Sequence, residues 1–131
     1  MTPTPRRGRL TRAQLEIMNV VWDLGQVTVA DVLNALAKQR QVARTTVLTM
    51  MRRLEDKGWL RHETKGNYFV YYPTISRKKT AREMVLTLVD TAFAGSAEGL
   101  IMALLDARGL SRKESRRIRS LIDKANRETT A

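Results

Sequence analysis

Cysteine is absent from this 131-residue sequence, and histidine occurs once, as His62. Without Cys there is no disulfide framework, no thiol nucleophile and no thiolate metal site. A lone histidine has no imidazole partners with which to hold a metal ion. No uncharged stretch approaches the roughly 20 apolar residues that span a bilayer, and the N-terminus does not resemble a secretory signal peptide. These absences predict a cytoplasmic protein with no membrane partner and no cofactor.

The sequence also lacks the combinations of residues that catalysis requires. There is no phosphate-binding loop of the G-x-x-x-x-G-K-[ST] type and no nucleophile with a neighbouring base. The carboxylates are distributed singly over the predicted helix surfaces, so no acid and base pair stands out. The sequence therefore predicts a binding protein and not an enzyme.

The charge that is present is strongly positive. Lys and Arg number 24 against 13 Asp and Glu, which gives a formal net charge of +11. The excess is spread along the chain, with 12 basic and 6 acidic residues up to Ser76 and 12 and 7 after it. Such a balance favours a polyanionic partner, although charge alone does not distinguish DNA, RNA and an anionic membrane.

The first half of the chain shows three helical patterns. Residues 1–9 lack periodicity and are interpreted as a flexible basic arm. Thr11 and Gln14 form the pattern of a capping box for a helix that runs to about Leu24. Thr28 is suited to cap a second helix that ends near Lys38. The segment 44–57 places its apolar residues on one side and is followed by Gly58, a typical C-terminal cap, which indicates a third helix.

An aromatic and β-branched run follows the third helix. The segments 59–63 and 68–72, joined by a turn at 64–67, are typical of a β-hairpin. Three short helices with such a hairpin predict a winged helix-turn-helix DNA-binding domain over residues 10–75, in which the third helix enters the major groove. The fold class is therefore expected to be mainly α.

Residues 76–131 are predicted to form a helical dimerisation region. Three further helices are indicated, beginning near Ser76, Ser96 and Ser111 and separated at Gly95 and Gly109. Helices of this size hardly close a core alone, and a second copy of the chain would bury their apolar stripes. The residues predicted to pack at this dimer contact are Met84, Val85, Leu88, Val89, Phe93, Leu100, Leu104, Ile118, Leu121 and Ile122.

The candidate DNA-binding residues lie on the third helix and on the hairpin. Hydroxyl, methyl and guanidinium groups on one side of a helix suit the base edges and phosphates of a major groove. A solvated polar face without a ligand is the alternative for the helix, and a purely structural turn is the alternative for Asn67. The predicted residues are Arg44, Thr45, Thr46, Thr49, Arg52, Arg53, Lys65 and Asn67.

Several other residues allow two interpretations. His62 is either a bystander or a pH-sensitive group, with the bystander favoured. For Trp22 and Trp59, packing in the core is favoured over stacking on bases. Cations cluster at 77–82, where they are placed to reach phosphates, and at 112–119, where a solvated face is the simpler interpretation.

Four segments together resemble one known family. The strings LTRAQLEIMNVVWDLG, VTVADVLNAL, VARTTVLTMMRRLEDKGWL and YFVYYP are similar to the penicillinase-repressor family of winged-helix regulators, the BlaI, MecI and CopY type, from about Leu10 to Asn126. The resemblance implies a homodimer that binds double-stranded DNA at a palindromic operator of genes for β-lactam resistance or for related stress or metal responses. It matches Thr46 and Thr49 to threonines that approach bases and Arg53 to a basic position behind them. Thr45 and Leu48 stand where relatives often carry Lys and Arg.

The resemblance also bears on how repression would end. Family members that are released by a membrane sensor protease carry an Asn-Phe bond in the fifth helix, whereas Ala103 and Leu104 are the aligned residues here. Whether a sensor protease is a partner, and whether it cuts the chain near this bond, is therefore left open. The Cys-rich tail of copper-responsive relatives has no counterpart, so copper sensing through thiolates is not expected.

The leading hypothesis is a sequence-specific repressor, and two alternatives follow from the same charge. A non-specific architectural protein would bind all duplex DNA alike. An RNA-binding adaptor would use the hairpin tyrosines as a stacking platform for single strands.

Overall fold

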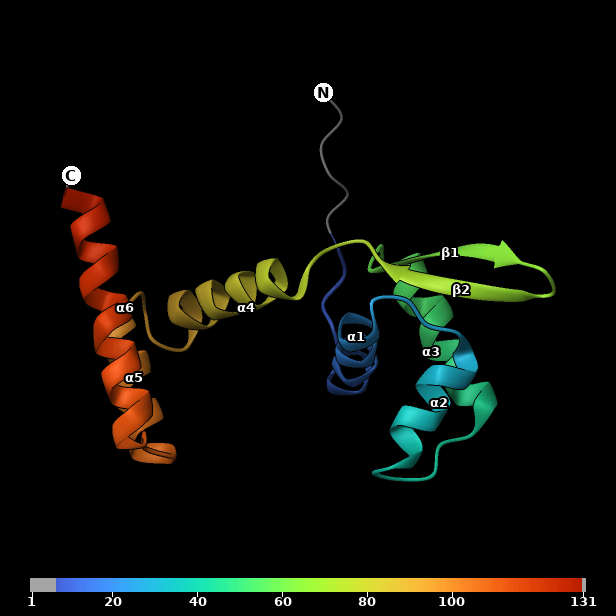
Figure 1. Ribbon diagram of the computed structural model, residues 1–131, viewed down its shortest axis with the longest axis horizontal. Helices are drawn as coiled ribbons and strands as arrows, with labels where there is room; N and C mark the ends of the chain where they lie inside the picture. The colour runs from blue at the N-terminus through green and yellow to red at the C-terminus, as the bar shows by residue number, and fades with distance from the viewer. Residues whose placement is uncertain (1–6, 131) are drawn as a thin grey trace. The chain divides into compact units, whose positions relative to one another are not determined.

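The structure, a computed structural model, describes residues 7–130 and divides the chain into two compact units between Arg82 and Glu83. The predicted mainly α fold is confirmed, and the first unit is a winged helix-turn-helix in which a hairpin follows three helices (Figure 1). The helices are α1 (Arg12–Leu24), α2 (Val29–Ala37), α3 (Arg44–Asp56), α4 (Arg77–Thr91), α5 (Ala97–Ala107) and α6 (Arg112–Thr130), and the strands are β1 (Leu60–Lys65) and β2 (Tyr68–Pro73).

Local side-chain hydrogen bonds start the first two helices. The Thr11 hydroxyl accepts from the Gln14 amide at 3.1 Å, and the Gln14 side chain accepts from the Thr11 amide at 3.0 Å. Thr28 and Asp31 form the same reciprocal pair at the start of α2. Each capping box supplies partners to amides that a helix N-terminus otherwise leaves unpaired. Both predicted helix starts are confirmed.

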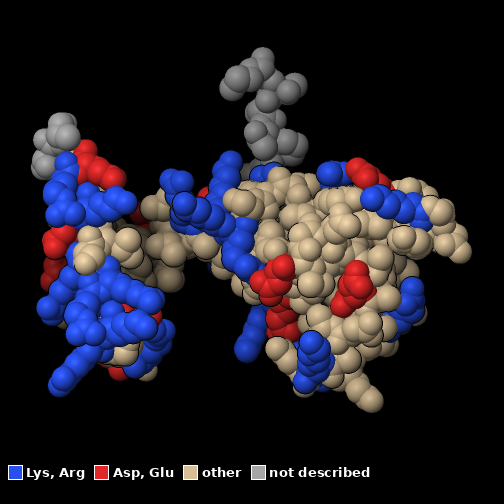
Figure 2. Space-filling view, in the orientation of Figure 1, with Lys and Arg blue, Asp and Glu red and all other residues tan. Residues whose placement is uncertain are grey.

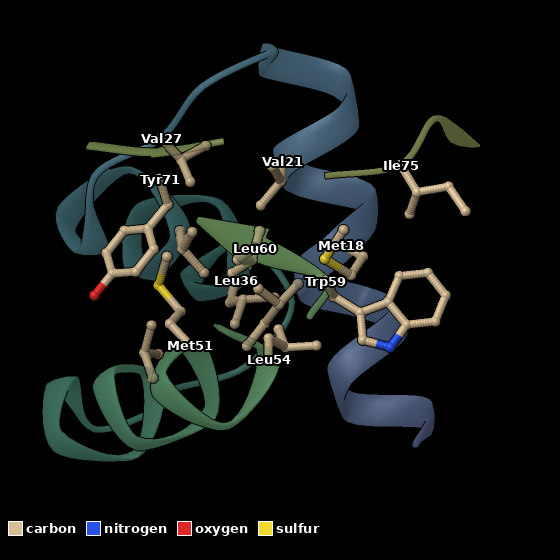
Figure 3. Packing of buried hydrophobic residues seen from close by; sticks show 13 residues of the cluster. Met18, Val21, Val27, Leu36, Met51, Leu54, Trp59, Leu60, Tyr71 and Ile75 are labelled. Carbon is tan, nitrogen blue, oxygen red and sulfur yellow. The ribbon is translucent and has the colours of Figure 1, made fainter. Parts of the chain in front are cut away.

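The core of the first unit is built around one side of α3. Val47, Met51 and Leu54 are fully buried, three or four residues apart. Figure 3 shows Met51 and Leu54 directed into a cluster that receives side chains from the other helices and from the hairpin. Because this side of α3 packs in the core, its opposite side faces solvent.

The hairpin is longer than the sequence suggested. Lys65 pairs with Tyr68, so only Gly66 and Asn67 form the turn, and the predicted turn over 64–67 was wrong at its first two residues. Gly66 has a φ of +64°, which glycine adopts without steric cost, and this permits a tight two-residue turn with glycine first. The strand ladder therefore continues through Thr64 and Lys65 to the tip.

A short segment before α1 packs against the end of α3. The Trp59 indole donates to the Gly8 carbonyl at 2.7 Å, and the Lys57 ammonium donates to the Arg9 carbonyl at 2.9 Å. Residues 7–9 of the predicted flexible arm are thus held by side chains that follow α3. Residues 1–6 of that arm lie outside the described residues.

The first turn of α4 belongs to the first unit. Thr80 and Ile75 are buried, and the Trp22 indole of α1 donates to the Ile75 carbonyl at 2.9 Å. Because these contacts hold the start of α4 on the first unit, the observed division falls inside α4, later than the boundary predicted after residue 75.

The second unit contains the rest of α4 together with α5 and α6. Ser96 accepts from the Gly99 amide at 2.9 Å at the start of α5, and Ser111 accepts from the Glu114 amide at 3.1 Å at the start of α6. No residue from Glu83 to Thr129 is buried. This stretch therefore has no core of its own. Within residues 7–130, no helix combines the length and apolar character that crossing a bilayer requires.

Candidate nucleic-acid interface

All six α3 residues that the sequence predicted to bind DNA are accessible to solvent, and five of them lie on the outward side of the helix. Arg44, Thr45, Thr46, Thr49, Arg52 and Arg53 are exposed. At 100° per residue, Thr45, Thr49 and Arg52 lie nearly opposite the buried side, and Thr46 and Arg53 flank them. Hydroxyl, methyl and guanidinium groups therefore share one convex surface, the chemistry with which a helix reads base edges.

The Thr49 hydroxyl already has one hydrogen bond. It donates to the Thr45 carbonyl, one turn earlier, at 2.9 Å. A hydroxyl has one proton to donate and two lone pairs that accept. While this bond persists, Thr49 is left as an acceptor, which suits the amino group of adenine or cytosine in a major groove.

The hairpin presents a second polar surface beside Arg61. The Arg61 guanidinium lies 4.4 Å from the centre of the Tyr72 ring and donates to Glu63 at 3.0 Å. The hydrogen bond from Arg61 lowers the pKa of the Glu63 carboxyl. Interaction with Tyr72 raises the pKa of Lys65. Lys65 and Asn67, both predicted to bind DNA, are exposed at the end of the hairpin.

A hydrogen bond between His62 and Glu55 connects the hairpin to α3, and the sequence did not predict it. The Nδ1 atom of His62 lies 2.7 Å from the Glu55 carboxylate, and its ring stacks on Phe69 with centroids 4.2 Å apart. Both side chains are about one third exposed. Burial raises the pKa of the neighbouring Tyr71, with Glu55 adding to the effect. His62 therefore positions the hairpin against α3. The only sequence signal for this role was that His62 lies on a predicted strand.

Arg77 is held by contacts inside the first unit, whereas the sequence grouped it with phosphate-binding cations. Its guanidinium donates to the Asp23 carboxylate at 2.6 Å and to the Asn19 carbonyl at 3.0 Å. The same group lies 5.6 Å from the centre of the Trp22 ring. Arg77 thus fastens the first turn of α4 to α1, and the exposed residues Lys78, Lys79 and Arg82 keep the predicted phosphate role.

Replacing Arg77 by Ala is expected to lower the free energy of unfolding of the first unit by about 1 kcal/mol, because an exposed ion pair and a cation over an aromatic ring are each worth about 0.5–1 kcal/mol. Urea unfolding followed by tryptophan fluorescence measures the change. Lys78→Ala, one residue further along the same helix, is the matched control and should leave the midpoint unchanged. Equal effects of the two substitutions would contradict the assigned contacts.

The second unit exposes the apolar residues that were predicted to form a dimer contact. Met84, Val85 and Leu88 of α4 are between 43% and 48% exposed, and Leu121 of α6 is 64% exposed. Leu104 and Ile122 are likewise exposed, whereas Val89, Phe93, Leu100 and Ile118 are half-buried. Apolar surface on this scale marks a place where another molecule packs. Among residues 7–130, no three acidic or histidine side chains gather in a way that would hold a metal ion.

Comparison with known proteins finds bacterial repressors. The sequence model of a family described as Penicillinase repressor matches residues 10–124. The penicillinase repressor of Bacillus licheniformis is 25% identical over 115 residues, which are 88% of this chain and 90% of that protein. Monomeric BlaI from Bacillus licheniformis, solved in complex with the blaP half-operator, is 34% identical over 54% of this chain and 87% of that one, with a TM-score of 0.48. Apo MarR from E. coli shares the fold, with a TM-score of 0.51 and 20% identity over 88% of this chain and 77% of that one.

Proposed function

The chain belongs to the penicillinase repressor family, a family of DNA-binding transcriptional repressors and not of enzymes, and from this premise we propose that it acts as a homodimer on a palindromic operator. The proposed target genes serve β-lactam resistance or a related stress or metal response, as the name of its Bacillus licheniformis relative suggests. A repressor works where the chromosome is, which for a bacterial protein is the cytoplasm.

The observation that carries the proposal is the arrangement of α3. Its buried side fixes the helix on the core through Val47, Met51 and Leu54, and its outward side offers Thr45, Thr49 and Arg52. A helix held in this way is presented as a rigid body to a major groove. We assign base contacts to the threonines, with Thr46 at the edge of the same surface. Phosphate contacts are assigned to Arg44, Arg53, Lys65 and three cations of the first turns of α4, Lys78, Lys79 and Arg82.

The homodimer is proposed from the exposed apolar residues of the second unit. No residue between Glu83 and Thr129 is buried, although α4, α5 and α6 carry many Leu, Ile, Val and Met side chains. A second copy would remove these side chains from water by a self-complementary contact. A two-fold symmetric pair of α3 helices reads inverted half-sites about one helical turn, or a multiple of it, apart.

Two substitutions test direct readout. After an operator has been selected from a random pool, Thr49→Ala is expected to weaken operator binding by about 1–3 kcal/mol and to leave random DNA nearly unaffected. Lys65→Ala should weaken binding to the operator and to random DNA alike, because a phosphate contact carries no sequence information. It should also reduce the salt dependence of binding by the amount that corresponds to about one phosphate contact. Fluorescence anisotropy at several salt concentrations measures both.

The same experiment distinguishes a specific repressor from a non-specific architectural protein, which the charge of +11 also favours. A specific repressor should prefer its operator over random duplex by about a thousandfold or more. Equal losses from Thr49→Ala on operator and random DNA would exclude base readout by this residue.

The sequence left open whether a sensor protease cleaves the chain near Ala103–Leu104. The bond lies inside α5, with Ala103 half-buried and Leu104 exposed. A protease that binds extended substrates would first have to unwind this helix. Incubation of the chain with such a protease, followed by mass spectrometry, identifies the bond that is cut.

A further inference from the structure

The last helix separates its charged residues from its apolar ones. At 100° per residue, the seven Lys and Arg side chains of α6 fall within a sector of about 160°, and Ile118, Leu121, Ile122 and Ala125 lie on the opposite side. Asp123 is the one carboxylate within the cationic sector. The seven cations, called here the α6 basic face, are Arg112, Lys113, Arg116, Arg117, Arg119, Lys124 and Arg127.

These cations are exposed and largely unneutralised. Figure 2 shows Lys and Arg gathered over α6. Arg108 forms an ion pair with Glu114 at 2.7 Å, and this pair includes none of the seven. Arg127 set aside, no member of the α6 basic face has an ion pair within the described chain, residues 7–130. The charges of the other six cations are therefore available to another molecule.

A second copy of the chain is a poor source of the missing negative charge. Each copy carries a formal charge of +11, so association of two copies leaves the excess unchanged. The second unit has seven carboxylates from Glu83 on: Glu114, Asp123 and Glu128 lie on α6 itself, where Glu114 is paired with Arg108, and Glu83, Asp90, Glu98 and Asp106 lie on α4 and α5. The apolar side of α6 already suits a contact between copies, and its basic side suits a polyanion.

Duplex DNA matches this surface in both length and charge. A helix of 19 residues is about 28 Å long at 1.5 Å per residue, and B-DNA carries one negative charge per about 1.7 Å of its axis. The cations at positions 112, 116 and 119 follow one row of the helix, so several of them can meet successive phosphates together.

We propose that the α6 basic face is a second DNA-binding surface, distinct from α3 and the hairpin, which contacts the phosphates of DNA outside the operator without reading sequence. The proposal rests on the proposed function in taking DNA as the partner. A repressor with such a surface holds flanking or distant DNA while α3 occupies its operator.

The test compares two variants of the full chain that lose equal charge. The variant R112Q/R116Q removes two members of the α6 basic face, and R12Q/K38Q removes two exposed cations of the first unit that have no assigned DNA contact. Binding to a long random-sequence duplex is measured at several salt concentrations. Each lost phosphate contact should reduce the slope of log K against log salt by about 0.9, so R112Q/R116Q is expected to reduce it by about 1.8. The control should leave the slope unchanged.

Three results would overturn the proposal. The first is a slope that is the same for both variants, which would make the face merely solvated. The second is a change in sedimentation mass for R112Q/R116Q alone, which would assign the face to contact between copies. The third is binding of vesicles of phosphatidylserine and phosphatidylcholine that depends on Arg112 and Arg116 while DNA binding does not. Failure of the proposed repressor function would show differently, as an absence of preference for any selected sequence by the natural chain.

Discussion

A chain with Leu88→Asp is expected to sediment as a monomer and to bind an intact operator about a hundredfold or more weakly than the natural chain. The reason for the first effect is that a carboxylate placed in a desolvated contact costs several kcal/mol. The second effect follows because joining two half-site readers raises affinity by about 10²–10⁴. Leu88 is 43% exposed in the single chain, so Asp is compatible with the folded monomer. Analytical ultracentrifugation and anisotropy on whole and half operators provide the measurements.

The neighbouring residue supplies the matched control. Thr87 is exposed and lies about 100° around α4 from Leu88 and about 160° from Val85. Thr87→Asp adds the same charge to the same helix and should leave both mass and operator affinity unchanged. If the Leu88→Asp chain were dimeric and bound the operator with full affinity, the apolar side of α4 would not be part of the dimer contact.

Replacing Leu54 by Ala is expected to lower the free energy of unfolding of the first unit by about 2–5 kcal/mol, because the truncation leaves a cavity in a packed core. Leu54 is fully buried between α3 and the rest of the cluster (Figure 3). Domains of this size have about 5–15 kcal/mol of stability in total, so operator binding should be lost at lower urea concentrations as well. Both tryptophans, Trp22 and Trp59, belong to the first unit, so urea unfolding followed by their fluorescence reports on it.

Leu24→Ala removes the same atoms from a side chain that is 57% exposed at the end of α1. It should change the free energy of unfolding by no more than about 0.5 kcal/mol, since it creates no cavity. Similar losses from the two substitutions would show that Leu54 contributes no more to the core than an exposed leucine does.

Much of the first unit could be predicted because its signals are local. The capping boxes at Thr11 and Thr28 join residues three positions apart, and the spacing of Val47, Met51 and Leu54 marks one side of a helix. The outward position of Thr45, Thr49 and Arg52 follows from the same spacing. The error at the hairpin turn has a local cause too, since Thr64 and Lys65 are equally compatible with a turn and a strand until the pairing with Phe69 and Tyr68 is known.

The sequence by itself determined where the helices begin, which side of each is apolar, and which side of α3 is free to meet DNA, because helix capping and helical periodicity act between residues within one or two turns. Only the tertiary structure decided that His62 pairs with Glu55, that Trp59 binds the carbonyl of Gly8 and that Arg77 is fastened to Asp23. The last two contacts join residues that are 51 and 54 positions apart. Their partners are selected by how the core brings helices and hairpin together, and no spacing in the sequence encodes that proximity.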